Sequence, residues 1–240
     1  KLGGEFRVNE SIKWNQGEAA LAPLADGRLA AVWVSESVNG TTSQGAPNLR
    51  GNLVGRLFQS NGQPVAAEHR INHIDAVCSR PVVTSLGEGF VVAWEQLDEK
   101  VVSNQTNIFV RKFDKNGVSP AQETRWNALT TGAQTNPVLT VWEGDGLLAW
   151  ECNVKATNSI EIHARMLGGG AEFRVNQKVK YHQQHPVVAG NGDGSYLVTW
   201  VNFVEPRNSI LTAVQFSNSD KADVTSGAHA SYEGPGAAPL

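Results

Sequence analysis

Two aromatic residues occupy matching positions in this chain, and each is followed by a glutamine. Trp14 and Tyr181 both occur nine residues after the start of a repeated Glu-x-Arg-x-Asn motif, and Gln16 and Gln183 follow two residues later. An aromatic ring can cover the C–H side of a sugar while an amide hydrogen-bonds its hydroxyls. We therefore predict a ligand-binding patch for a carbohydrate from these four residues. In the alternative interpretation, the rings cap the core and the glutamines bond the loop backbone.

Two histidines lie beside this aromatic position in the fourth repeat. His182 and His185 form a His-x-x-His pair, which we place at the margin of the ligand patch. No nearby cysteine or acid completes a metal-binding set. We predict neither a metal site nor a cofactor.

The repeated motif itself contains acids and bases that resemble catalytic groups. Its four copies begin at Glu5, Glu68, Glu123 and Glu172, and an arginine on a later run recurs as Arg56, Arg111 and Arg165. Glutamate–arginine pairs across neighbouring strands are a common way to stabilise sheets. A catalytic pair is needed once rather than four times, so we predict a structural role and no catalytic residue among them.

Each copy is followed by the same series of short apolar runs and glycine turns. The second run ends on Trp33, Trp94, Trp150 and Trp200. Four short strands per repeat, with no sustained helical period, predict an all-β fold. We expect a four-bladed β-propeller of four-stranded antiparallel blades over residues 1–216, with blades beginning near residues 5, 68, 123 and 172. A sandwich of two packed sheets is the alternative.

The ends of the repeat region suggest how such a ring closes. The chain opens on a motif strand at residues 5–9 and ends its fourth repeat one strand short, near residues 210–216. This order resembles the "velcro" closure of β-propellers, which implies that residues 5–9 complete the last blade. Residues 217–240 are rich in alanine, glycine and proline, a composition typical of disorder, and we expect an attachment tail there.

The connections differ in length on the two sides of the predicted blades. One side has short glycine turns. The other, which we name the long-loop side, has two sets of longer connections. They are residues 10–18, 73–80, 128–136 and 177–185, and residues 35–52, 95–107, 151–159 and 201–209. Variable loops on a rigid scaffold often carry function, so we expect the site there.

Composition limits the partners and the compartment. The net charge of −3 gives no basic excess for nucleic acid, and no apolar stretch is long enough to span a membrane. Three glycosylation sequons occur, at Asn9, Asn39 and Asn104. We expect a secreted or cell-surface protein, and the absence of an initial Met indicates a processed or excised form.

The two cysteines leave two interpretations open. Cys78 lies in a loop that enters the second repeat, and Cys152 follows the tryptophan-ended run of the third. If the blades are neighbours, the two residues can form a disulfide across them. Two buried free thiols are the alternative.

These observations favour binding over catalysis. The first prediction is a lectin-like, carbohydrate-binding module that uses the long-loop side, with a glycan as partner. The second is a structural or adhesion module that binds another extracellular protein. The third is a polysaccharide-active enzyme with an acid such as Glu151 or Glu205 on the long-loop side.

Overall fold

The structure is a computed structural model of the chain. It describes residues 4–99, 105–142, 144–156, 158–178, 180–191, 194–205 and 208–216. The chain divides into two compact units, Lys1–Pro137 (unit 1) and Val138–Leu240 (unit 2). Each unit is described by itself below.

The described residues form four antiparallel sheets. Sheet 1 contains β1 (Gln16–Pro23), β2 (Leu29–Thr41), β3 (Pro47–Phe58) and β4 (His69–Arg70). Sheet 2 contains β5 (Cys78–Leu86), β6 (Gly89–Asp98), β7 (Gln105–Phe113) and β8 (Thr124–Arg125). Sheet 3 contains β9 (Gln134–Trp142), β10 (Asp145–Val154), β11 (Ser159–Met166) and β12 (Phe173–Arg174). Sheet 4 contains β13 (Gln183–Gly190), β14 (Tyr196–Glu205) and β15 (Asn208–Phe216).

The strand order confirms the predicted fold class. In sheets 1 to 3, three consecutive strands pair in sequence order, and the fourth strand comes from the Glu-x-Arg-x-Asn motif of the next repeat. Four antiparallel sheets of this kind are the blades of an all-β, four-bladed propeller. Within the described ranges, no helix is long and apolar enough to cross a membrane.

Sheet 4 differs from the others because it has three strands among the described residues. Residues 4–9 belong to no strand in this structure, and the ring of Phe6 packs against Phe58 of β3 at 6.0 Å between centroids. Closure of the fourth blade by residues 5–9 therefore stays a prediction. The predicted tail, residues 217–240, lies outside the described residues.

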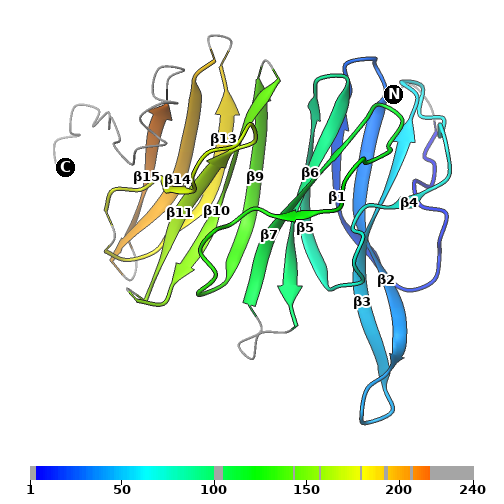
Figure 1. Cartoon of the computed structure of the whole chain (residues 1–240), viewed down its shortest axis with the longest axis horizontal. Helices are drawn as coiled ribbons and strands as arrows, with labels where there is room; N and C mark the ends of the chain where they lie inside the picture. The colour runs from blue at the N-terminus through cyan, green and yellow to red at the C-terminus, as the bar shows by residue number, and fades with distance from the viewer. Residues whose placement is uncertain are drawn as a thin grey trace. The chain divides into compact units, whose positions relative to one another are not determined.

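The connections between second and third strands are shorter than the sequence suggested. In sheet 1, β2 continues to Thr41 and β3 starts at Pro47, so most of residues 35–52 is paired strand. Figure 1 shows this hairpin extending beyond the other strands of the sheet. In sheet 3, β10 and β11 leave only residues 155–158 between them. The expected long loops are largely strand extensions, because cross-strand pairing satisfies the backbone of polar residues as well as apolar ones.

Each unit has its own apolar core between two sheets. In unit 1, Val32 and Leu53 of sheet 1 pack with Phe90 and Trp94 of sheet 2. In unit 2, Leu147 and Ile162 of sheet 3 pack with residues of sheet 4, including Trp200. The tryptophans that end the second runs are all buried, so they build the core and are unavailable for a ligand.

The motif asparagines follow the short fourth strands, two residues after each strand ends. Asn72, Asn127 and Asn176 are all buried, and each side-chain oxygen accepts a hydrogen bond from a backbone N–H of the adjoining third strand. Their amide groups also donate to a carbonyl two residues ahead. The asparagine side chain therefore takes the place of the next backbone hydrogen bond between the third and fourth strands, and the chain leaves the sheet at this point.

The motif glutamates join successive repeats. The Glu68 carboxylate accepts from the backbone N–H groups of Glu10 and Ser11, and Glu123 does the same for His73 and Ile74. Both glutamates bind the residues that directly follow the asparagine of the preceding copy. This contact confirms a structural role for the glutamate.

The predicted pairing of these glutamates with the third-strand arginines is wrong in detail. Arg56 forms an ion pair with Glu10 and donates to the carbonyl of Val8 in the first copy. Arg111 donates to the carbonyl of Ile71 in the second copy at 2.5 Å. The arginines thus also connect one repeat to the next, because their long side chains reach past their own sheet.

Candidate functional site

The first strands of the sheets share a strained residue near their start. Glu18, Arg80, Asn136 and His185 each lie two residues into their strand, with φ of 51°, 48°, 53° and 55°. A left-handed φ is unfavourable for residues other than glycine. The strand register is irregular at this point in β1, β5 and β13, as expected for a β-bulge. Bulges re-aim side chains and are frequent beside active sites, so this position is the best candidate for function.

Carboxylates hold the backbone at these positions. The Glu18 carboxylate accepts a hydrogen bond from the Arg80 N–H. The Glu95 carboxylate accepts from the Asn136 N–H at 2.6 Å, and Glu151 accepts from the His185 N–H at 2.8 Å. A charged acceptor makes a strong bond to a backbone donor, which helps to maintain the strained conformation.

In unit 1 these contacts converge on a cluster that we name the bulge site: Glu18, Ser79, Arg80, Glu95 and Asn136. The Arg80 guanidinium lies 2.9 Å from Glu95, and the Ser79 hydroxyl lies 3.1 Å from the same carboxylate. The Glu95 side chain is 4% exposed, whereas that of Arg80 is 54% exposed. Glu18 is exposed. The site therefore combines a buried carboxylate, an accessible carboxylate and an arginine that bonds the first through its guanidinium and the second through its backbone N–H.

The sequence alone did not find this site. Arg80 and Asn136 carry no motif, and the bulge that gives them their conformation depends on pairing with the neighbouring strand. The available signal was the Trp-Glu pair at Glu95 and Glu151, which places an acid directly after the repeated tryptophan of two second strands.

The acids predicted for an enzyme, Glu151 and Glu205, have different outcomes. Glu151 is 3% exposed and binds the His185 backbone, so it holds a bulge and is not free on the surface. Glu205 is the last residue of β14, and its side chain lies outside the described residues.

The predicted ligand-binding glutamines are anchors for the loop. Gln183 is 1% exposed, its oxygen accepts from the Trp200 indole at 3.0 Å, and its amide donates to the Lys180 carbonyl. Gln16 makes the corresponding bonds to Trp33 and to the Lys13 carbonyl. The prediction that these amides bind a sugar is corrected, because both are used internally.

The second repeat has no glutamine at this position. Cys78 pairs with Gln96, as Gln183 pairs with Asn202, so Cys78 occupies the corresponding place in the sheet. The Trp94 indole donates instead to Gln96 on its own strand, at 3.2 Å.

The two aromatic residues remain accessible. Trp14 is 43% exposed and Tyr181 is 41% exposed, so neither is a buried core cap. Both have left-handed backbones, with φ of 65° and 71°. A lysine ammonium lies near each ring, Lys13 at 5.7 Å and Lys180 at 4.9 Å from the centroid.

The two histidines of the fourth repeat have separate contacts. The His182 Nδ1 accepts from the Ile160 N–H at 3.2 Å, while His185 is the bulge residue of β13. Among the described residues, no group of three or more potential metal ligands is present.

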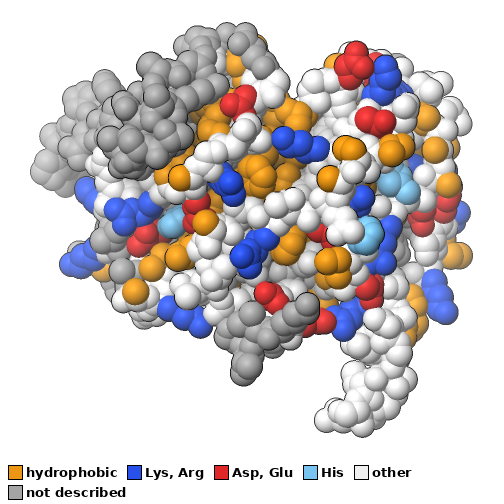
Figure 2. Space-filling view, in the orientation of Figure 1, with side chains coloured by type: hydrophobic (Ala, Val, Ile, Leu, Met, Phe, Trp, Pro, Cys, Tyr) orange, Lys and Arg blue, Asp and Glu red, His pale blue; other side chains and the backbone are white. Residues whose placement is uncertain are grey.

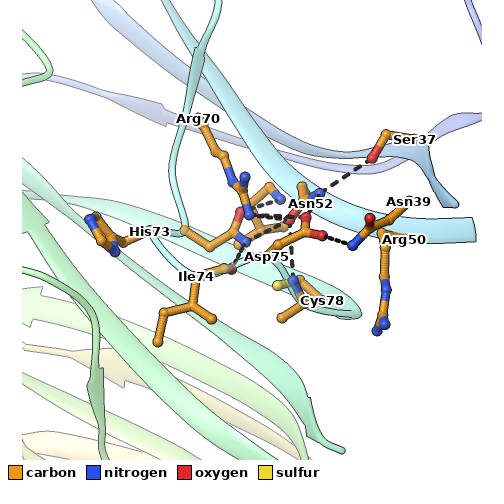
Figure 3. A network of polar contacts seen from close by, with 12 residues as sticks. Ser37, Asn39, Arg50, Asn52, Arg70, His73, Ile74, Asp75 and Cys78 are labelled. Carbon is orange, nitrogen blue, oxygen red and sulfur yellow. Dashed lines mark hydrogen bonds and ion pairs between the residues drawn. The ribbon is translucent and has the colours of Figure 1, made fainter.

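A second polar cluster joins the β2–β3 hairpin to the loop before β5 (Figure 3). Asp75 accepts from Asn39 and Asn52 at 2.7 Å each and from Arg70 at 3.2 Å. The Asn52 oxygen accepts in turn from Arg70 and Asn72. Because these donors and acceptors satisfy one another, the cluster supports the hairpin rather than forming a binding site.

Unit 2 contains a titratable cluster around His163 of β11. Its Nδ1 lies 2.7 Å from the Glu172 carboxylate, and its Nε2 lies 3.7 Å from Glu161, which is 3.6 Å from Arg174. Figure 2 shows acidic, basic and histidine side chains close together over β11. Burial alone lowers the pKa of His163, but its contacts with Cys152 and Glu172 more than offset burial and raise the pKa to about 9.

The predicted disulfide is not formed. Cys78 and Cys152 are both buried free thiols, as in the alternative interpretation. Burial raises the pKa of the Cys78 thiol to about 12, and this disfavours the reactive thiolate.

The three sequons have different environments. The Asn9 amide donates to the Ser11 carbonyl, and the Asn39 amide donates to Asp75. Asn104 lies outside the described residues.

Comparison with known proteins finds solved structures with a similar fold. No family model matches this chain, and no curated protein sequence matches it. A protein of unknown function from Dyadobacter fermentans is similar in structure, with a TM-score of 0.58 and 10% identity over 86% of this chain and 67% of that one. The α-L-arabinofuranosidase arb93a of Fusarium graminearum has a TM-score of 0.52 and 12% identity over 82% and 60%. Zg3597 of Zobellia galactanivorans, a family 117 glycoside hydrolase, has a TM-score of 0.51 and 8% identity over 88% and 67%.

These similarities correct the predicted function. The similar structures with a stated activity are glycoside hydrolases, which contradicts the preference for a lectin-like module. A glycan partner agrees with the arabinobiose bound to the Fusarium enzyme. The alternative of an adhesion module that binds another protein has no support from these structures.

Proposed function

We propose that this chain is a polysaccharide-active enzyme that cleaves glycosidic bonds at the bulge site. The observation that carries the proposal is that two carboxylates meet at one residue: Glu18 accepts from the Arg80 backbone N–H, and Glu95 pairs with the Arg80 guanidinium. Glycosidases act through a pair of carboxyl groups, one of which exchanges a proton with the leaving oxygen. The similarity of the fold to glycoside hydrolases supports this choice.

The bulge site offers a distinct role for each residue. Glu18 is exposed and is the carboxyl group suited to proton transfer with the substrate. Glu95 is the second carboxylate, fixed by donors from Ser79, Arg80 and Asn136. The partly exposed Arg80 is placed to hydrogen-bond sugar hydroxyls. We also propose that the enzyme acts outside the cell, where polysaccharides are found.

The proposal is tested by release of reducing ends from a panel of neutral and acidic polysaccharides that includes arabinan. Glu18→Gln is expected to lower activity by roughly 10²–10⁴-fold, the usual contribution of a positioned acid or base. Glu95→Gln is expected to lower activity to a similar degree. The matched control is Glu88→Gln, since the Glu88 side chain is 83% exposed and its ion-pair partner among the described residues is Lys115. Full activity of both Glu18→Gln and Glu95→Gln would contradict the proposal.

A further inference from the structure

The loop before β13 holds an exposed tyrosine in a conformation that suits glycine. Tyr181 has φ of 71° and is 41% exposed. The third repeat has Gly132 at the matching position, with φ of 94°. The backbone therefore requires a left-handed residue here but not an aromatic one. An exposed ring kept at a strained position indicates a function for the ring.

The backbone around Tyr181 is fixed on both sides. Gln183 donates to the Lys180 carbonyl and accepts from the buried Trp200. The His182 carbonyl accepts from the Phe203 N–H at 3.0 Å, and its ring accepts from Ile160. A surface that is rigid before binding loses little conformational entropy when a ligand arrives.

The charge around Tyr181 is positive. The Lys180 ammonium lies 4.9 Å from the ring centroid, Lys178 is exposed in the same loop, and residues 177–190 contain no Asp or Glu. The one carboxylate that contacts this segment in the described hydrogen bonds, Glu151, is 3% exposed and bonds the His185 backbone. Among the described side chains of residues 177–190, an anion placed against Tyr181 therefore meets cations and no acid.

The matching loop of the first repeat has a mixed charge environment. Lys13 lies over Trp14, but Glu36 binds the following Asn15 through both its backbone and its side chain. Glu18 is exposed four residues after Trp14. This loop has the same geometry without the positive character, and it serves as an internal control.

We propose that Tyr181 and Lys180 form a subsite for an anionic sugar residue, carboxylated or sulfated, of a polysaccharide. The sugar ring stacks against the exposed part of Tyr181, and its anionic group pairs with the Lys180 ammonium. This subsite rests on the proposed function, because it supplies the substrate class of the same enzyme.

The test is binding by isothermal titration calorimetry with three probes: trigalacturonate, a sulfated galactan oligosaccharide and neutral galactotriose. The first two distinguish a carboxylate from a sulfate. We expect at least one anionic probe to bind more tightly than the neutral one, and its affinity to fall as salt is added. Lys180→Gln should weaken that binding by roughly two- to fivefold, as for a solvent-exposed ion pair.

Tyr181→Gly is the decisive variant because glycine is favoured by the backbone there. It should weaken binding about tenfold or more, while the melting temperature changes by no more than about 3 °C. Lys13→Gln and Trp14→Gly are the matched controls and should leave the affinity for the anionic probe unchanged. Equal affinity for neutral and anionic probes, no binding of any probe, or full affinity in Tyr181→Gly would each overturn the subsite. Since binding is measured without turnover, loss of the subsite is distinguishable from failure of the proposed hydrolysis at Glu18 and Glu95.

Discussion

The Gln183 side-chain oxygen accepts a hydrogen bond from the Trp200 indole nitrogen at 3.0 Å, inside the core of unit 2. Gln183→Leu leaves that indole N–H without its acceptor in a buried position. A loss of about 2–3 kcal/mol in the free energy of unfolding is expected from such an unsatisfied donor. Chemical denaturation measures it.

The same substitution in the first repeat provides the comparison. Gln16 makes the corresponding bond to Trp33 but is only partly buried, so water can replace part of the lost bond. We expect Gln16→Leu to cost less than Gln183→Leu. If Gln16→Leu lowers the free energy of unfolding as much as Gln183→Leu, or more, then burial does not determine how much this hydrogen bond stabilises the fold.

The motif glutamates should contribute through their bonds to the preceding repeat. In Glu68→Gln, one carboxylate oxygen that accepts from Glu10 or Ser11 is replaced by an amide that cannot accept. The expected loss is ~1–2 kcal/mol of unfolding free energy for a charge-assisted bond. Glu88→Gln, which changes the same group at an exposed turn, should be neutral within ~0.5 kcal/mol. Equal stability of Glu68→Gln and Glu88→Gln would show that the bonds from Glu68 to the preceding repeat do not stabilise the fold.

His163 should make unit 2 less stable at alkaline pH. Its pKa is 6.5 in the reference state and about 9 in the fold, so protonation stabilises the folded state. This contribution is complete below pH 6.5 and is lost as pH rises through about 9, with a total on the order of 3 kcal/mol. Urea unfolding of the native chain and of His163→Gln at pH 6 and pH 9.5 measures the difference. The variant should lose most of this dependence, whereas parallel curves for the two proteins would refute the assignment.

The cysteines should react only after unfolding. Cys78 and Cys152 are 3% and 0% exposed, so a thiol reagent should label neither in the native protein and both in denaturant. A reducing agent should leave the melting temperature unchanged. A clear decrease on reduction would instead indicate a disulfide.

Gly89 should not tolerate a side chain. A Cβ there would lie 2.0 Å from the Phe113 carbonyl oxygen, which belongs to the paired strand β7 and cannot move freely. Gly89→Ala is therefore expected to cost more than ~3 kcal/mol, as for severe overpacking. Gly17→Ala is the control, since nothing lies within 4 Å of its Cβ position and its φ is not left-handed. A well-folded Gly89→Ala with native stability would contradict the close approach.

The sequence by itself determined the repeated elements of this protein. Tryptophans at the end of each second run, glycine turns and the Glu-x-Arg-x-Asn copies predicted the strands and their grouping into sheets, because strand periodicity and turn chemistry are local properties. The structural role of the motif glutamates was also predictable, because a catalytic pair is needed once, whereas this glutamate occurs in all four copies of the motif.

Only the tertiary structure decided which side chains are available for function. Gln16 and Gln183 resemble ligand-binding amides in sequence, yet each is bonded to a tryptophan seventeen residues away. Arg80 carries no motif, yet a strand bulge and pairing with the neighbouring strand β6 bring it to 2.9 Å from Glu95. Such partners are chosen by strand register and sheet packing, which depend on contacts distant in the chain. The sequence pattern therefore fixes which residues can form strands, whereas burial and long-range pairing decide which polar groups are already satisfied and which remain free to bind or react.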